Sequence, residues 1–216
     1  MSNELLFFIQ TLLIVGFALG ALRLGSAALT AWVAIQALIA NLFVLKQITL
    51  FGLDVTASDV FAIGSLLGLN FLQEFFSREE ARKATWICFF FMIFFTIISQ
   101  IHLLYHPNVH DFSQGAFTAL LTFSPRLLIA SMTVFFIVQQ IDIRLFAYLK
   151  KTRPSMSFAL RSGISLVCTQ FLDTFLFSFA GLYGIVISVL DIIVVSFLIK
   201  LIVIFSFSSV MRLAKA

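Results

Sequence analysis

The chain has 216 residues, of which 61% are hydrophobic and only 11% are charged, whereas soluble domains average about 25% charged residues. This composition excludes an ordinary soluble protein, and in a membrane protein a net charge of +4 reports orientation more than a nucleic-acid partner. A helix needs about 20 apolar residues to cross a bilayer, so the length allows about six or seven spans and no appended enzymatic domain. Two cysteines, Cys88 and Cys168, are too few for a disulfide framework or a four-cysteine metal site.

The apolar runs predict an all-α fold, a polytopic transmembrane helical bundle with about seven spans. No basic segment precedes the first run, so we expect this helix to be retained rather than cleaved as a secretory signal. The whole chain, residues 1–216, is expected to form one integral membrane domain. In chain order, the expected spans cover residues 5–22, 27–45, 57–76, 85–104, 126–149, 162–181 and 184–206.

Pairs of glycines and one Phe-rich run predict which helix faces pack together and which meet lipid. Gly16 and Gly20, like Gly64 and Gly68, are four residues apart, a spacing that lets helix backbones approach closely. The run 88–95 has no polar face, so we expect its helix to face lipid. The segment 105–125 is the longest one expected outside the membrane, where it would form a short interfacial helix or an outer lid.

The basic residues predict that the N-terminus lies outside and the C-terminus inside, because cytoplasmic loops accumulate lysine and arginine. In this orientation Lys46 and Arg126 fall on the outer side, and Arg144 and Lys200 fall within spans. The cytoplasmic side receives the other ten: Arg23, Arg78, Arg82, Lys83, Lys150, Lys151, Arg153, Arg161, Arg212 and Lys215.

The fifth and sixth spans each contain a glutamine and an aspartate three residues apart. Gln139 and Asp142 form the first pair, and Gln170 and Asp173 repeat the spacing in the next span. Residues three apart share a helix face, and consecutive spans are antiparallel, so the pairs predict an inverted arrangement around a site near the membrane midplane. We expect both carboxylates to face one cavity at different depths.

Buried carboxylates in a membrane are functional candidates by default, because an ionisable group costs roughly 2.5–3.5 kcal/mol at the bilayer centre. The alternative is a structural ion pair, either Asp142 with Arg144 or Asp173 with Lys200. A carboxylate beside an amide suits the edge of a planar heterocycle such as guanine, with phenylalanine rings on its faces. A cation or a proton relay would also use such carboxylates.

The third span adds Asn70 and Glu74, which are four residues apart and share a helix face. Glu74 is also close in sequence to Arg78, so an interfacial ion pair is an alternative to a functional role. The remaining polar candidates in or near spans are Asn41, Arg126, Asp191 and Lys200.

His102, His106 and His110 are spaced like a metal-binding row on a helix. Pro107 is expected to break that helix, which favours solvated histidines at the outer interface, and we expect neither a metal nor a cofactor. The chain has no P-loop, H-E-x-x-H or G-x-S-x-G motif. Nucleotide hydrolysis by a P-loop is therefore excluded, and an enzyme is not expected.

The order of the polar residues resembles the queuosine-precursor transporter family, also described as vitamin-uptake-like transporters, over roughly residues 38–212. The resemblance implies a six-span core, here residues 25–212, preceded by an extra helix at 1–24. Asn70 departs from the aspartate usual in the family, which is expected to shift preference between neutral and cationic ligands, and Phe76-Ser77 departs from Tyr-Gly. The matching positions are Asn41, Leu50-Phe51-Gly52, Asn70-Phe71-Leu72-Gln73-Glu74, Ala81-Arg82, Arg126, Ser131, Gln139, Asp142, Phe146, Leu160-Arg161, Ser165, Gln170, Asp173-Thr174, Phe177 and Lys200.

The resemblance implies a bacterial inner-membrane importer of a 7-deazaguanine, such as preQ0, preQ1 or queuine, for tRNA modification. Its expected partners are the heterocyclic substrate and the lipid bilayer; a homodimer is compatible with this function, and no nucleic acid is expected. Two alternatives stay open: a vitamin-binding membrane subunit of a multi-component ATP-driven importer, and a purely structural membrane subunit. The expected substrate-binding residues are Asn41, Asn70, Glu74, Arg126, Gln139, Asp142, Gln170 and Asp173, and the expected gating or coupling residues are Arg161, Asp191 and Lys200.

Overall fold

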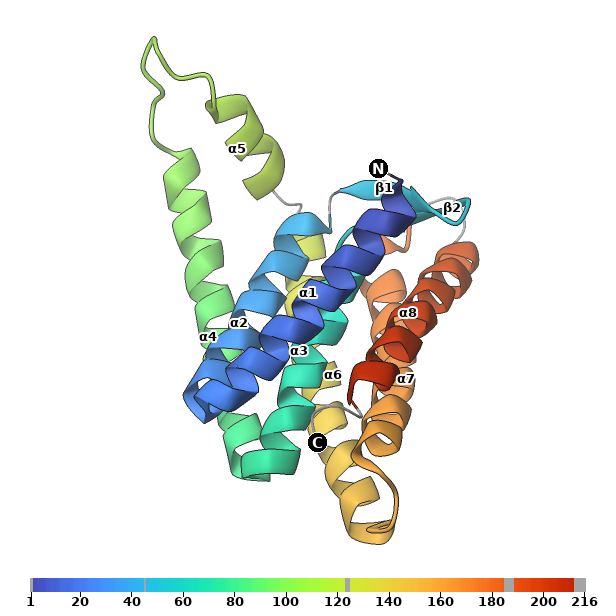
Figure 1. Ribbon diagram of the computed structural model, residues 1–216. Coiled ribbons are helices and arrows are strands. Elements are labelled where there is room, and N and C mark those ends of the chain that lie inside the picture. Colours follow the sequence, from blue (N-terminus) through green and yellow to red (C-terminus); the bar gives the residue numbers. More distant parts are fainter. Residues whose placement is uncertain (1, 45, 123–124, 185–188, 212–216) are drawn as a thin grey trace.

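The computed structural model describes residues 2–44, 46–122, 125–184 and 189–211, with side chains described except at 47, 53–56, 125–128, 182, 191, 195 and 206–211. The chain forms a bundle of long helices, with a small β-hairpin at one end, here called the hairpin end (Figure 1). The expected all-α, polytopic helical bundle is confirmed. The elements are α1 (Asn3–Leu24), α2 (Ser26–Phe43), β1 (Gln47–Leu50), β2 (Leu53–Thr56), α3 (Asp59–Phe71), the π-helical turn η1 (Leu72–Phe76), α4 (Arg78–Leu103), α5 (Gln114–Leu121), α6 (Pro125–Thr152), α7 (Phe158–Phe177), the π-helical turn η2 (Ser178–Leu182) and α8 (Val189–Met211).

Each of the seven expected spans corresponds to a helix, and the boundaries differ by a few residues in most cases. The largest difference is α4, which begins at Arg78, because Ser77 caps its first turn by accepting a hydrogen bond from the Glu80 backbone N–H. Apolarity alone does not show this polar first turn. Five helices in the described chain are long and apolar enough to cross a membrane: Asn3–Leu24, Ser26–Phe43, Arg78–Leu103, Ile129–Thr152 and Phe158–Gly181, and α8 adds a shorter apolar stretch, Ile192–Phe205.

α3 is the central helix of the bundle. Every residue from Asp59 to Phe71 is buried except Ala62, as expected for a helix that is apolar all round and enclosed by others. Its 13 residues rise only roughly 20 Å, and η1 extends it by five residues to Phe76. α3 packs against α2, α1, α8, α6 and α7, so it can carry polar groups to several helices at once.

The Gly64 and Gly68 pair lies where α3 meets α2. A Cβ on Gly68 would come within 2.9 Å of Val33 Cγ2, and the carbonyl of Gly64 accepts a hydrogen bond from Trp32 Nε1. Gly16 and Gly20 have open space instead, with no heavy atom within 4 Å of a built Cβ. The packing predicted from small residues is thus confirmed for the pair in α3, and the described structure shows no close contact at the pair in α1.

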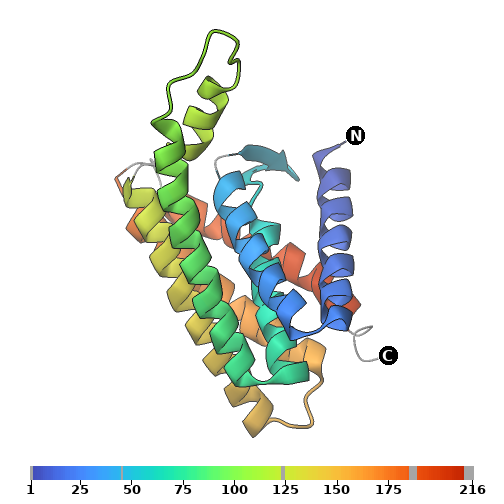
Figure 2. The same cartoon turned by 90° about the vertical axis from the view of Figure 1, so that its left-hand side faces the viewer.

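α4 lies along one side of the bundle, as both views show (Figures 1 and 2). Its residues Phe90, Phe91 and Phe94 are exposed, which agrees with the expected lipid-facing run, whereas Cys88 and Met92 are buried on the inner face. The helix ends at Leu103, before Pro107, as expected. The three histidines are exposed and lie along the end of α4 and the following loop, so they do not share one helix face.

Two small elements complete the fold. The strands β1 and β2 pair antiparallel, with Leu50 opposite Leu53, and the two turn residues Phe51 and Gly52 both have positive φ, 53° and 79°, as tight hairpin turns require. No strand was predicted here. The short helix expected within 105–125 is confirmed as α5, which Gln100 holds by donating a hydrogen bond from Nε2 to the Leu121 carbonyl at 2.8 Å. Which end of the bundle lies outside the cell stays a prediction.

Candidate functional site

A pocket of about 130 Å³ lies near the hairpin end, between α2, α3, α6, α7 and α8. Its polar lining includes the carboxylates Asp59 and Asp173, the amide Asn41 and the ammonium group of Lys200. The helices bring these residues together from positions that are far apart in the sequence. Three of them, Asn41, Asp173 and Lys200, are residues that the sequence singled out.

Lys200 lies between the two carboxylates of this pocket. Its Nζ donates a hydrogen bond to Asp173 Oδ2 at 2.6 Å and lies 3.8 Å from Asp59 Oδ1. The side chains of Lys200 and Asp59 are buried, whereas that of Asp173 is 20% exposed. The other oxygen of Asp59, Oδ2, is buried without a hydrogen-bond partner among the described residues. With all three groups ionised, the pocket holds one negative charge in excess.

Asn41 of α2 lines the same pocket and is bonded to Ser131 of α6. Its Oδ1 accepts a hydrogen bond from Ser131 Oγ at 2.6 Å, and its Nδ2 donates to the Ala37 carbonyl of its own helix at 2.9 Å. Phe135 and Phe177 add aromatic rings to the lining. The pocket therefore combines carboxylates, an amide and aromatic side chains, which are the groups expected around a planar polar heterocycle.

A second polar set, here called the buried layer, lies one helical turn further from the hairpin end. It contains Gln139 and Asp142 of α6 and Gln170 of α7, all fully or almost fully buried. Asp142 Oδ1 accepts a hydrogen bond from Ser165 Oγ at 2.5 Å, and Gln139 Nε2 donates to Ser65 Oγ at 3.3 Å. Asp142 Oδ2, Gln139 Oε1 and Gln170 Oε1 have no partner among the described residues.

Such unpartnered buried oxygens are uncommon, because each costs the desolvation of a polar group. Here three of them lie in one layer, and all three are acceptors. Thr174, which lines the pocket, donates a hydrogen bond to the Gln170 carbonyl of the layer. The layer therefore begins one turn of α7 from the pocket, and its unpartnered acceptors make it a candidate for contact with a ligand that carries N–H donors.

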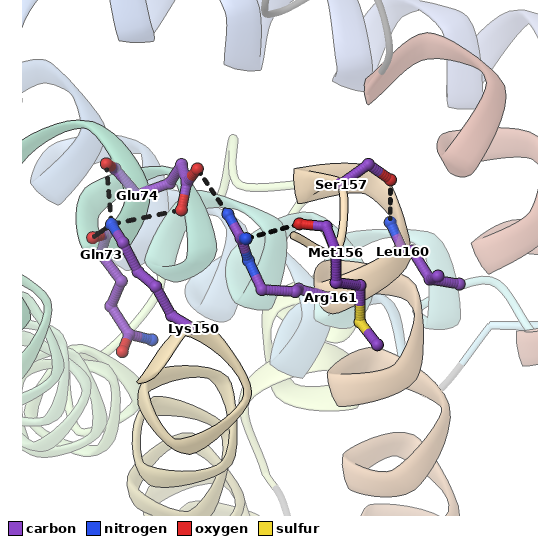
Figure 3. Close-up of polar contacts among 7 residues, drawn as sticks. All are labelled: Gln73, Glu74, Lys150, Met156, Ser157, Leu160 and Arg161. Atoms are coloured by element: carbon purple, nitrogen blue, oxygen red, sulfur yellow. Dashed lines mark hydrogen bonds and ion pairs between the residues drawn. The ribbon is translucent and has the colours of Figure 1, made fainter. Parts of the chain in front are cut away.

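Glu74 belongs to a third set at the opposite end of the bundle, here called the Glu74 cluster (Figure 3). Arg161 Nη2 donates a hydrogen bond to Glu74 Oε1 at 2.7 Å, and Lys150 Nζ lies 3.2 Å from Glu74 Oε2. Lys150 also donates to the backbone carbonyls of Gln73 and Glu74, and Arg161 Nη1 donates to the Met156 carbonyl at 2.6 Å. These contacts tie η1, the end of α6 and the start of α7 together.

The described structure shows which of the ion pairs considered from the sequence form. Asp173 does pair with Lys200, whereas Asp142 bonds to hydroxyl groups and Arg144 is exposed. Glu74 pairs with Arg161 and Lys150, from other helices. Asp142 and Asp173 do not line the same pocket, although a single turn of α7 separates their surroundings.

The remaining predicted residues are placed differently. Asn70 is buried near the Glu74 cluster, and its Nδ2 donates to Ser162 Oγ at 3.0 Å. The side chains of Arg126 and Asp191 lie outside the described residues. Two residues of these sets were not predicted as functional: Asp59, which stands at the start of an expected span, and Lys150, whose predicted place is only the cytoplasmic side. An acid inside the limits of an apolar run was the signal for Asp59.

Comparisons with known proteins place the chain in a family. Residues 56–214 match the family model described as a putative vitamin uptake transporter. The chain is also similar to a protein of Bacillus subtilis (strain 168) named probable queuosine precursor transporter, with 32% identity over 162 residues, which cover 74% of this chain and 71% of that protein. No solved structure matches. The chain therefore belongs to the putative vitamin uptake transporter family, and it is a multi-pass bacterial membrane transporter, not an enzyme.

Proposed function

We propose that this transporter imports a queuosine precursor, a 7-deazaguanine such as preQ0, preQ1 or queuine, into the cytoplasm. The observation that carries the proposal is the pocket at the hairpin end, in which Asp59, Asp173 and Asn41 surround a space lined by Phe135 and Phe177. The name of the Bacillus subtilis relative supports the same ligand class.

The guanine-like edge of such a ligand presents a ring N–H, an exocyclic amine and a carbonyl side by side. A carboxylate accepts from both nitrogen donors, and an amide or hydroxyl donor satisfies the carbonyl. Asp173 is the accessible carboxylate of the pocket, and Asn41 and Ser131 are the neighbouring amide and hydroxyl. Phenylalanine faces stack on the ring, as aromatic side chains do on nucleobases.

The buried layer is the next stage of the proposed path. In an alternating-access cycle the helices move and the ligand leaves the pocket. Its N–H groups then donate hydrogen bonds to the unpartnered oxygens of Gln139, Asp142 and Gln170. The Glu74 cluster closes the far end in the described state, since Arg161 joins η1 to α7. In this scheme Arg161 is a gating residue, and Lys200 exchanges partners as the ligand binds.

The test is rescue of tRNA modification in a bacterial strain that cannot make queuosine. With a low external concentration of a 7-deazaguanine, the strain is expected to recover queuosine in its tRNA only when it expresses this transporter. Asp142→Asn is expected to lower the initial rate of recovery by about tenfold, since the amide replaces an acceptor oxygen with an N–H group, and a mismatched buried polar group costs about 1–3 kcal/mol. Asp111→Asn, which changes an exposed loop carboxylate, is the matched control.

Two results would count against the proposal in different ways. Absence of rescue by the unmodified transporter, despite normal membrane expression, would contradict the function itself. Full rescue by Asp142→Asn would contradict the role of the buried layer and leave the function standing. Monodisperse elution of each variant in detergent separates a loss of transport from a loss of folding.

Vitamin uptake is a second candidate, because the matching family is described by that activity. A vitamin-binding subunit of an ATP-driven importer would need a separate ATPase. The test uses liposomes that contain only this purified chain. Uptake of a 7-deazaguanine by these liposomes without ATP would favour the 7-deazaguanine importer over such a subunit. Uptake that depends on ATP and a co-purified ATPase would favour the second candidate.

A further inference from the structure

Two carboxylates share one ammonium group in the pocket at the hairpin end, and this charge balance bears on ligand choice. Lys200 contacts Asp173 at 2.6 Å and Asp59 at 3.8 Å, so it offsets one of two negative charges. No other charged side chain among the described residues lines the pocket. Buried charges are costly unless they are paired, so a pocket with this surplus binds a positive ligand better than a neutral one.

The two carboxylates also differ in accessibility and in bonding. Asp173 is the more exposed, whereas Asp59 is buried and its Oδ2 has no partner among the described residues. The Lys200 ammonium would need to move by only about 1 Å to bring its 3.8 Å separation from Asp59 into hydrogen-bond range. Lys200 can therefore pair with Asp59 in place of Asp173, which leaves Asp173 available to a ligand.

We propose that this pocket selects a cationic ligand, a planar heterocycle that carries an ammonium group: its N–H edge binds Asp173 while Lys200 moves to Asp59, and its positive charge offsets the surplus negative charge of the two carboxylates. The inference rests on the proposed function, and it narrows the substrate class from 7-deazaguanines in general to those with a positively charged side chain. The bound state then contains two carboxylates and two ammonium groups, with no charge in excess.

The experiment compares two probes in liposomes that contain the purified full-length chain. One probe is 7-aminomethyl-7-deazaguanine, which is a cation at neutral pH, and the other is neutral 7-cyano-7-deazaguanine. We expect the unmodified transporter to take up the cation with at least about tenfold higher kcat/KM than the neutral probe, because close charge pairs at interfaces couple by more than 1.4 kcal/mol.

Variants that change the net charge of the pocket test the inference directly. Asp59→Asn leaves one carboxylate and one ammonium, so we expect the ratio of kcat/KM for the cation to kcat/KM for the neutral probe to fall by about tenfold. The double variant Asp59→Asn with Lys200→Gln leaves the single carboxylate of Asp173 and restores the surplus of one negative charge. We expect it to regain the preference that Asp59→Asn loses, which a merely structural role of Asp59 would not produce.

Asp111→Asn is the matched control, because it removes a carboxylate outside the membrane. Ser113 donates hydrogen bonds to Asp111 Oδ1 from both N and Oγ, which hold the pKa of that carboxyl below its usual range. Asp111 is therefore ionised at neutral pH, and its loss changes the net charge of the chain as much as Asp59→Asn does. We expect its ratio of cationic to neutral uptake to equal that of the unmodified transporter.

The outcomes separate the inference from the proposed function. Uptake of neither probe by folded, unmodified transporter would overturn both. Uptake of both probes without preference for the cation would overturn the inference alone, and so would an unchanged preference in Asp59→Asn. If Asp59→Asn elutes as aggregate, the preference of the double variant still decides: equal uptake of both probes would contradict the inference.

Discussion

Glu74 and Lys200 lie at opposite ends of the same bundle, and each contacts two side chains whose charge is opposite to its own. Glu74 binds two cations, Arg161 and Lys150, and so leaves a positive surplus, whereas Lys200 binds two carboxylates and leaves a negative one. The Glu74 cluster also bonds to three backbone carbonyls, but the carboxylates at Lys200 line a cavity. The difference suggests that the first set joins helices and the second leaves room for a ligand.

α3 and η1 run from the pocket around Lys200 to the Glu74 cluster. The helix dipole is favourable for the excess charge at each of these two ends. Asp59 is the first residue of α3, where the helix dipole favours a negative charge. Lys150 donates to the carbonyls of Gln73 and Glu74 in η1 at the other end, where the dipole favours a positive charge. One central helix thus stabilises opposite charges at its two ends.

The largest expected effect is that of Glu74→Gln, which removes the carboxylate from the buried Arg161 side chain. Breaking a buried pair from one side costs about 3–5 kcal/mol, because an uncompensated charge stays buried. We expect a marked fall in the midpoint temperature of thermal unfolding in detergent. Glu80→Gln is the control, since Glu80 pairs at the surface with Lys83, whose side chain is 69% exposed. Equal midpoints for the two variants would contradict the joining role of the cluster.

Gly68→Ala tests whether the close packing of α3 on α2 is needed for the pocket around Lys200 and for the Glu74 cluster. Its new Cβ would lie 2.9 Å from Val33 Cγ2 and 3.0 Å from Trp32 Cδ1, and overpacking of this kind costs about 1–3 kcal/mol. Thermal unfolding measures the loss of stability, and liposome uptake measures the effect on transport. Gly20→Ala, with no heavy atom within 4 Å, should leave both unchanged; a similar loss there would show that the contact at Gly68 is not responsible.

Ser131→Ala sharpens the comparison on the side of the pocket. It removes the hydroxyl that donates to Asn41 Oδ1 at 2.6 Å, at a cost of about 1 kcal/mol in stability. We also expect a several-fold higher KM for the 7-deazaguanine probe, because Asn41 loses its orientation. Thr30→Ala removes a hydroxyl that bonds only within its own helix, to the Ser26 carbonyl. An unchanged KM in Ser131→Ala would mean that Asn41 does not contact the ligand.

Lys150→Met is expected to have the smallest effect. The Lys150 side chain is 42% exposed, and exposed ion pairs contribute about 0–1 kcal/mol. Arg161 then remains as the partner of Glu74, so the cluster loses its positive surplus without losing its buried pair. Thermal unfolding should show a shift far smaller than that of Glu74→Gln, with Lys83→Met as a surface control. A shift as large as that of Glu74→Gln would make Lys150, rather than Arg161, the main partner.

The helices were predictable from the sequence because apolar runs of this length have few other folds. The hairpin was not, since its strands have four residues each and adjoin apolar spans, and the turn depends on a positive φ at Phe51 that this residue type does not indicate. The two π-helical turns likewise leave no signature in the composition of their segments.

The sequence predicts which polar residues belong to the site better than it predicts their hydrogen-bond and ion-pair partners. Gln139, Asp142, Gln170 and Asp173 stand out because polar groups are rare in these spans. Their partners depend on how each helix is rotated about its axis, which local sequence does not specify. Ser165 illustrates this, because a hydroxyl in a membrane helix can also bond to its own backbone, and only the packing of α6 on α7 brings it to Asp142.

The single ammonium shared by Asp59 and Asp173 also bears on what drives the transport cycle. If the cargo is a monocation, each import event carries one positive charge toward the negative interior of the cell. A membrane potential of 100 mV is then worth about 2.3 kcal/mol per molecule, which corresponds to roughly fiftyfold accumulation. A bacterium could concentrate such a base by its voltage alone, without ATP and without a coupled proton.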